Sequence, residues 1–343
     1  MLPGGVFNQS YAKDVAIVRT KTQWLILFAA LAFMFLIPVF ANDYWLGWLT
    51  KLCITIVAVL GLHILTGLCG QFSIGHAAFV GVGAYTAAIL TTKYGVSGWL
   101  CLPISALVTG SVGLLFGLPC FRLKGFYLAV STLAASFIII WCMRHFATWT
   151  GGLEGLDVVT LKIGAADLSY NQPAYWLAAA VLVVATYCAK NIQRTSVGRA
   201  FVAIRDNELA AEVNGISVFR YKMLAFFISC LFAGVAGWLW ANTQMRVTPD
   251  QFRLNDSIWY FGMLVIGGIG STSGVFFGAV SLRALQVTID QVAPMIQSVQ
   301  LVIALNLVVF SGVIVLFLLF VPRGITSLWE KLKLQYRLHP FSY

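Results

Sequence analysis

The feature that most constrains this chain is a succession of apolar stretches that recur from near the N-terminus almost to the C-terminus. A helix needs about 20 mostly apolar residues to cross the hydrocarbon core of a bilayer. Because no water is available there, the backbone polar groups of a lipid-exposed segment must be satisfied internally, as they are in a helix. We therefore predict an all-α, polytopic integral membrane protein, with about ten transmembrane helices and some broken helices.

Composition supports this class, since 60% of the residues are hydrophobic and 10% are charged, against about 25% charged residues in soluble domains.

The eighth predicted span is short, so a re-entrant pair over Ser257 to Val292 is an alternative. The ten predicted spans are Trp24 to Phe40, Lys51 to Cys69, Gly75 to Thr92, Trp99 to Pro119, Phe126 to Met143, Ala174 to Lys190, Met223 to Thr243, Ser257 to Gly270, Gly274 to Val292 and Ser298 to Val321.

Lysine and arginine are distributed unevenly between the two sides of these spans. With the N-terminus inside, cytoplasmic segments hold fifteen of the 22 residues, external segments hold six, and one lies within the ninth span. Cytoplasmic loops carry such an excess. We expect cytoplasmic termini at 1–23 and 322–343, and a membrane domain at 24–321. That domain includes a cytoplasmic loop at 191–222 and an external loop at 144–173, the latter a predicted docking surface for a binding protein.

One cytoplasmic stretch is unusually polar, with seven charges in the 24 residues from Arg199 to Lys222, whereas the other 319 residues share 27. Gly198 precedes a run of helix formers, and Gly215 follows it, as glycine commonly does after a helix C-terminus. Apolar residues recur at helical spacing between them. Two glutamates four residues apart disfavour an isolated helix. We predict one helix from Arg199 to Val213, which either binds a basic partner or lies solvated at the lipid surface.

The chain shows no energy source of its own. A phosphate-binding loop requires Gly-Lys-Ser/Thr, and no lysine here follows a glycine. Only one of the twelve acidic residues, Asp290, falls within a predicted span, so an intramembrane carboxylate relay is not expected. A stand-alone ion-coupled carrier or channel is nevertheless the alternative class. The seven cysteines form no Cys-x-x-Cys pair, so we expect no metal site.

Two glycine-rich breaks interrupt the apolar pattern. In the first, Ser73 is predicted to cap the following helix, whose positive N-terminus suits a carboxylate. Gln71, Ser73, Gly75 and His76 would then face a substrate path or gate, or else satisfy loop carbonyls. The fifth span contributes polar residues that either line the path or bond their own helix; these are Ser131 and Thr132.

Glycines spaced four apart predict close helix packing. They are Gly113 and Gly117 in the fourth span, and Gly270, Gly274 and Gly278 in the second break.

Five segments together resemble the LivM-type permeases of branched-chain amino-acid ABC importers. They are "GQFSIGHAAFVGVGAYTAAIL", "TGGLEGL", "SVGRAFVAIRDNELAAEVNGISVFRYK", "LVIGGIGSTSGVFFGA" and "FVPRGI", which occur in family order from about Trp24 to Ile325. The third resembles the Glu-Ala-Ala loop that docks in a cleft of the partner ATPase. Leu209 stands where the usual motif has its first alanine. The resemblance assigns coupling to Arg199, Arg205, Asp206, Glu208, Ala210, Ala211, Glu212 and Gly215.

The resemblance implies a non-catalytic permease subunit in a bacterial inner membrane. The family assembles from two homologous permeases, two ATPases and a periplasmic substrate-binding protein, in contact with membrane lipid and not with nucleic acid. No cofactor is expected in this chain, because ATP and Mg bind to the ATPases. Branched-chain amino acids are the expected cargo, and urea, short amides or aromatic carboxylates are the alternatives.

Overall fold

The computed structural model of this protein describes residues 21–120, 126–159, 161–163, 166–168, 171–292, 299–321, 324–329 and 331. Long helices dominate it, and the strands are only two residues each. The elements are α2 (Lys21–Phe40), α3 (Asp43–Leu62), the π-helix η1 (His63–Leu68), α4 (His76–Lys93), α5 (Gly98–Cys120), α6 (Phe126–His145), α7 (Ala147–Thr150), β1 (Leu156–Asp157), β2 (Lys162–Ile163), β3 (Ala166–Asp167), α8 (Asn171–Arg194), α9 (Ser196–Asp206), α10 (Glu208–Val213), α11 (Val218–Gln244), β4 (Arg246–Val247), the 3-10 helix η2 (Pro249–Phe252), α12 (Leu254–Gly267), α13 (Thr272–Val292) and α14 (Val299–Phe320).

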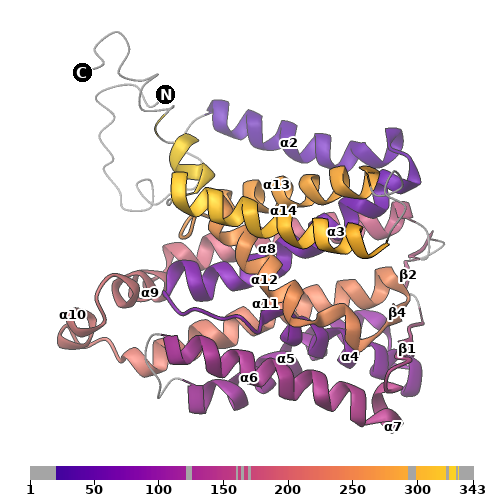
Figure 1. The fold of residues 1–343 in the computed structure, drawn as a ribbon, viewed down its shortest axis with the longest axis horizontal. Coiled ribbons are helices and arrows are strands. Elements are labelled where there is room, and N and C mark those ends of the chain that lie inside the picture. The colour runs from indigo at the N-terminus through magenta and orange to yellow at the C-terminus, as the bar shows by residue number, and fades with distance from the viewer. Residues whose placement is uncertain are drawn as a thin grey trace.

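The long helices run side by side and form a bundle, with the short elements gathered at its two ends (Figure 1). One end carries α9 and α10, and we call it the α9 end. The opposite end carries α7, β1 and β4, and we call it the β1 end. The two-stranded sheet at the β1 end pairs β1 with β4, with Leu156 opposite Val247 and Asp157 opposite Arg246.

Helix α11 lies at the centre of the bundle and packs against α3, α4 and α5. The close approach depends on small residues that face one another. A Cβ atom on Gly83 of α4 would lie 2.6 Å from the Cα atom of Gly234 on α11, and one on Gly113 of α5 would lie 2.5 Å from Cys230 Sγ. Ordinary side chains do not fit at such distances, so glycine at these positions permits the interhelical dispersion contacts that hold membrane helices together.

Helices α12 and α13 form a second closely packed pair. A Cβ atom on Gly274 would lie 2.7 Å from the carbonyl oxygen of Gly267, and one on Gly278 would overlap the carbonyl of Met263. The prediction for Gly270 as a helix-packing residue is wrong, because Gly270 lies in the turn between the two helices with φ +98°. Gly117 is buried within α5.

Six helices of the described part are long and apolar enough to cross a membrane, namely α3 with η1, α5, α6, α8, α11 and α13. Shorter apolar helices occur at Trp24–Phe40 and Ala304–Phe320. The all-α, polytopic membrane class is therefore confirmed, while the count of ten spans stays a prediction. Helix α12 starts next to η2 at the β1 end and reaches the α9 end. Its 14 residues extend about 21 Å at 1.5 Å per residue, which is less than a hydrocarbon core of about 30 Å, so the re-entrant alternative stays a prediction beside the full span.

Candidate functional site

The polar stretch after α8 folds as two helices, and the prediction of one continuous helix from Arg199 to Val213 is wrong. The backbone of Asn207 is extended, with φ −157° and ψ 109°, and it separates α9 from α10. Its side chain caps α10 by accepting a hydrogen bond from the Ala210 N–H at 3.0 Å. Asparagine favours such a cap over helix interior, and this is the local signal for the break.

Helix α9 begins earlier than the glycine pattern predicted. Ser196 is its first residue, and the Thr195 hydroxyl accepts a hydrogen bond from the Gly198 N–H at 3.4 Å. Gly198 thus lies inside the helix, where it is buried against the end of α8. The expected end at Gly215 is confirmed, because α10 stops at Val213 and Gly215 takes the left-handed φ of +82°.

Helix α9 is held against the bundle by its apolar face. Phe201 and Ile204 are buried, and the Phe201 ring meets the Tyr221 ring of α11 edge to face, with centroids 6.3 Å apart. Burying each of these side chains contributes about 2 kcal/mol. Arg199 is exposed on the other side and donates a hydrogen bond to the carbonyl oxygen of Arg194.

The side chain of Arg205 lies where three segments of the backbone meet. Its Nη1 atom donates a hydrogen bond to the Gly67 carbonyl oxygen of η1 at 3.0 Å. A Cβ atom on Gly70 would lie 2.9 Å from Arg205 Cγ, and one on Gly270 would lie 3.0 Å from Arg205 Nη1. The guanidinium therefore joins α9 to the turn after η1 and to the α12–α13 turn, and its Nη2 pairs with Asp206 at 2.9 Å.

An ion pair fixes α10 to the N-terminal part of α11. Lys222 Nζ lies 2.9 Å from Glu208 Oε2, with Lys222 6% exposed as a residue and the Glu208 side chain 39% exposed. The adjacent glutamates had suggested a basic partner outside the chain. For Glu208 a basic group comes from α11 of the same chain, and a basic partner protein stays a prediction.

The outward face of α10 exposes two large apolar side chains beside a carboxylate. Leu209 is 71% exposed and Val213 is 87% exposed, with the exposed carboxylate of Glu212 between them, while Ala211 is buried against the bundle. We call Leu209, Glu212 and Val213 the α10 tip. It lies beyond the ends of the long helices (Figure 1). Leu209 and Val213 are therefore left uncovered by the rest of the described chain.

The first glycine-rich break brings several predicted gate residues together. Helix α4 begins at His76 with Gly75, which has no side chain, as its N-cap, and Ser73 makes no bond to its first turn, so the predicted capping role of Ser73 is wrong. Within the described residues the buried Ser73 hydroxyl has no hydrogen-bond partner. The Ser257 hydroxyl instead accepts a hydrogen bond from the Ala77 N–H at 2.9 Å.

Helix α6 closes over the start of α4. The Ile74 N–H donates to the Thr132 hydroxyl at 3.2 Å, and that hydroxyl donates to the Ala129 carbonyl oxygen. Gly75 leaves room for this contact, since a Cβ atom there would overlap the Thr132 carbonyl. Ser131 bonds only within its own helix, to the Leu128 carbonyl oxygen. Thr132 is buried and bonds its own helix, which is one of its two predicted roles, while its place in a substrate path stays a prediction.

The remaining gate residues are also buried. His76 Nε2 lies 2.9 Å from the Ala58 carbonyl oxygen of α3, so its ring satisfies a backbone group. The Gln71 carbonyl oxygen accepts a hydrogen bond from the Thr66 hydroxyl at 2.9 Å. The turn that contains these residues begins at Gly70, beside Arg205, so the predicted coupling segment contacts the backbone that leads into the predicted gate.

A polar cavity of about 480 Å³ lies towards the β1 end, between α3, α8, α11 and α13. Asp43 and Lys51 line it from α3, and Arg283 and Gln286 line it from α13. Arg283 Nη2 donates to the Thr55 hydroxyl at 2.8 Å, and so ties α13 to the middle of α3. Sequence patterns missed this cavity because its polar residues belong to helices far apart in the chain.

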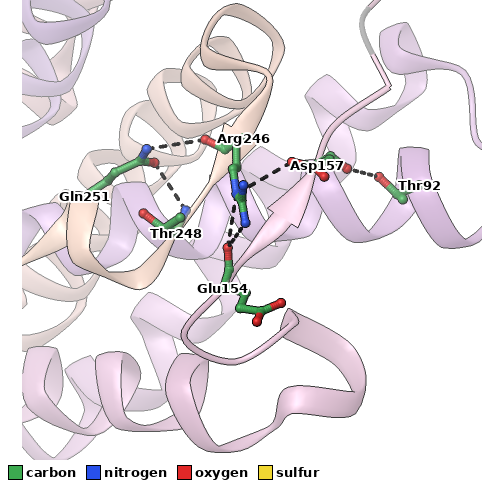
Figure 2. A network of polar contacts seen from close by, with 6 residues as sticks. All are labelled: Thr92, Glu154, Asp157, Arg246, Thr248 and Gln251. Atoms are coloured by element: carbon green, nitrogen blue, oxygen red, sulfur yellow. Dashed lines mark hydrogen bonds and ion pairs between the residues drawn. The ribbon is translucent and has the colours of Figure 1, made fainter.

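The β1 end is closed by a polar network (Figure 2). Arg246 of β4 donates to the Glu154 carbonyl oxygen at 3.0 Å and lies 3.6 Å from the Asp157 carboxylate. Nearby, Asp250 accepts from Arg253 and Arg144, and these hydrogen bonds lower the pKa of the Asp250 carboxyl. The predicted external loop is thus fastened to the α11–α12 connection. Among the described residues, no cluster of His, Cys, Asp and Glu is arranged to hold a metal ion.

Membrane-length helices, a broken-helix core and an exposed helical tip at one end define the class as a polytopic membrane permease. The family described as the branched-chain amino acid transport system permease component matches residues 44–319, and the chain belongs to it. It is a transmembrane permease subunit of an ABC importer of that family, which confirms the resemblance seen in the sequence.

Individual relatives agree with this family. The chain is 30% identical over 333 residues to the high-affinity branched-chain amino acid transport system permease protein LivM of Salmonella typhimurium, over 89% of this chain and 75% of the relative. The same figures hold for LivM of Escherichia coli. The autoinducer 2 import system permease protein LsrC of Klebsiella pneumoniae is 31% identical over 145 residues, 40% of this chain and 41% of that protein. No solved structure matches the chain.

Proposed function

We propose that this chain is one permease of an ATP-driven importer for branched-chain amino acids or related small solutes. The family and the LivM relatives support this cargo. The cavity near the β1 end adds support, because it offers a carboxylate and two cations to a solute that carries both an ammonium and a carboxylate group.

The observation that carries the coupling role is the α10 tip. Leu209 and Val213 expose apolar surface on a helix whose inner side is fastened by the Lys222–Glu208 ion pair. We propose that a partner ATPase, which binds ATP and Mg, receives this tip in a cleft. The chain itself is then a non-catalytic subunit. Its α9 end faces the cytoplasm of a bacterial inner membrane, and both termini lie on that side.

Arg205 supplies a route for the mechanical signal. When the ATPases close, movement of α10 and α9 would pull on the Gly67 carbonyl and the glycine turn that surrounds the guanidinium. Both turns join long helices, so their displacement would rock α3 against α4 and α12 against α13, as alternating access requires. A homologous second permease completes the path, and a periplasmic binding protein docks at the β1 end.

The test is to make the tip polar with Leu209→Asp and Val213→Asp. Both residues are exposed, so the fold should persist, whereas docking into an apolar cleft should be lost. We expect at least a tenfold loss of ATPase co-purification, because each buried apolar side chain contributes about 2 kcal/mol. Leu209→Met combined with Val213→Ile, which keeps the tip apolar, is the matched control. Normal ATPase co-purification together with unchanged substrate-stimulated ATP hydrolysis would overturn the proposal.

A further inference from the structure

Helices α2 and α8 touch at one end and separate towards the other. Near the β1 end three side chains of α8 donate hydrogen bonds to the α2 backbone. The Tyr175 hydroxyl bonds the Met34 carbonyl at 2.9 Å, Trp176 bonds that of Phe35 at 3.3 Å, and Gln172 bonds that of Pro38 at 3.4 Å. Towards the α9 end the two helices enclose a groove of about 750 Å³, which Phe276 of α13 borders.

The groove has the length and the surface of a lipid site. On α8 it extends from Leu182 to Arg194, which is about 18 Å at 1.5 Å per residue, a little more than half of a hydrocarbon core of about 30 Å. On α2 it is lined by apolar side chains, among them Trp24, Leu27 and Phe28. Trp24 and Phe28 stack, with centroids 5.5 Å apart.

Two cations lie at the α9 end of this apolar groove. Lys190 and Arg194 both line it, and their spacing of four residues places them on one face of α8, where like charges repel. Neither forms an ion pair with a carboxylate of the described chain. Arg194 Nε is buried and has no hydrogen-bond partner among the described residues. An anion at this position would reduce the repulsion between the two cations and would accept a hydrogen bond from Arg194 Nε.

We propose that this groove binds one anionic phospholipid from the membrane leaflet on the α9 side. Its acyl chains fill the apolar walls between α2 and α8, and its phosphate accepts hydrogen bonds from Lys190 and Arg194. A zwitterionic lipid binds less well, because its own ammonium group faces the same two cations. The lipid fills the space between the helices and so sets the angle of α2 to the rest of the bundle.

The test uses the full chain, purified in mild detergent with equal amounts of phosphatidylglycerol and phosphatidylethanolamine. Native mass spectrometry then counts retained lipids. We expect one phosphatidylglycerol per chain. Lys190→Gln and Arg194→Gln should each weaken phosphatidylglycerol binding about fivefold, because one basic residue near the membrane surface changes the affinity by about that factor. The two substitutions together should weaken binding about thirtyfold. Arg220→Gln, which removes an exposed cation outside the groove, should leave binding unchanged.

A steric variant separates groove binding from general surface charge. Val183→Trp keeps both cations and fills the groove, so we expect it to expel the lipid. Leu107→Trp adds the same side chain on an exposed face of α5 and should not affect binding. Equal retention of the two lipids, or retention of phosphatidylglycerol by Val183→Trp, would overturn the proposal.

A photoreactive p-benzoylphenylalanine at Val183 identifies the occupant in native membranes. The expected product is the full chain plus the mass of one phospholipid. A cross-link to a polypeptide, either a partner subunit or residues 1–20 of this chain, would show that protein covers the groove and would refute the lipid site. The proposal does not depend on the transported solute or on the α10 tip.

Discussion

Replacing Glu208 and replacing Lys222 should destabilise the α10 position by unequal amounts, because the two partners of this ion pair differ in exposure. The gross Coulomb attraction at 2.9 Å is about 6 kcal/mol at an effective dielectric constant of 20, and desolvation of the buried ammonium offsets most of it. Glu208→Gln leaves Lys222, which is 6% exposed, without its counter-charge. Lys222→Met leaves a carboxylate whose side chain is 39% exposed and can be hydrated.

We expect Glu208→Gln to destabilise the closed position of α10 by about 2.5 kcal/mol, below the range for a fully buried pair. Lys222→Met should cost less than about 1 kcal/mol, as exposed pairs do. Because α10 can open without global unfolding, the measurement is amide hydrogen exchange over residues 208–216. Exchange should accelerate roughly 70-fold in Glu208→Gln and less than about fivefold in Lys222→Met.

The double variant is the control for this reasoning. With both charges removed, no unpaired ammonium remains in the closed state, so exchange should return close to the rate of Lys222→Met. If Lys222→Met accelerated exchange as much as Glu208→Gln, or the double variant exchanged faster than either, burial of Lys222 would not be the cause.

Two further substitutions test the contacts around the glycine turns. Arg205→Lys keeps the charge but loses the guanidinium that bonds both Gly67 and Asp206. We expect ATP hydrolysis to continue while solute uptake falls at least tenfold. A proportional loss of hydrolysis and uptake would refute coupling through this contact. Thr132→Val removes the buried acceptor of the Ile74 N–H. It should cost about 2 kcal/mol, seen as a lower Tm of the purified chain, and an unchanged Tm would contradict that role.

The helix positions were predictable because hydrophobic length is a local property of the sequence. The predicted spans at Trp24 to Phe40 and Phe126 to Met143 lie within α2 and α6, since any apolar run of that length must form a helix in a bilayer. The glycine after α10 was predictable for a similar reason, because its left-handed backbone follows the end of a helix.

The error at Ser73 occurred where the partner comes from a distant segment. Ser73 has the right chemistry for a cap, yet Ser257 reaches the first turn of α4 instead. Ser257 is 180 residues away in the chain and could be recognised as the partner only after the helices were placed. Lys222, which lies 2.9 Å from Glu208, belongs by contrast to the same polar segment.

The sequence alone therefore determined the membrane class, the approximate positions of the spans and the polar segment that joins α8 to α11, because hydropathy, charge and glycine act over a few neighbouring residues. Only the tertiary structure decided that Arg205 lies against two glycine turns and that α2 and α8 diverge around two cations. These arrangements depend on contacts between residues more than a hundred positions apart, and no local pattern encodes such distances.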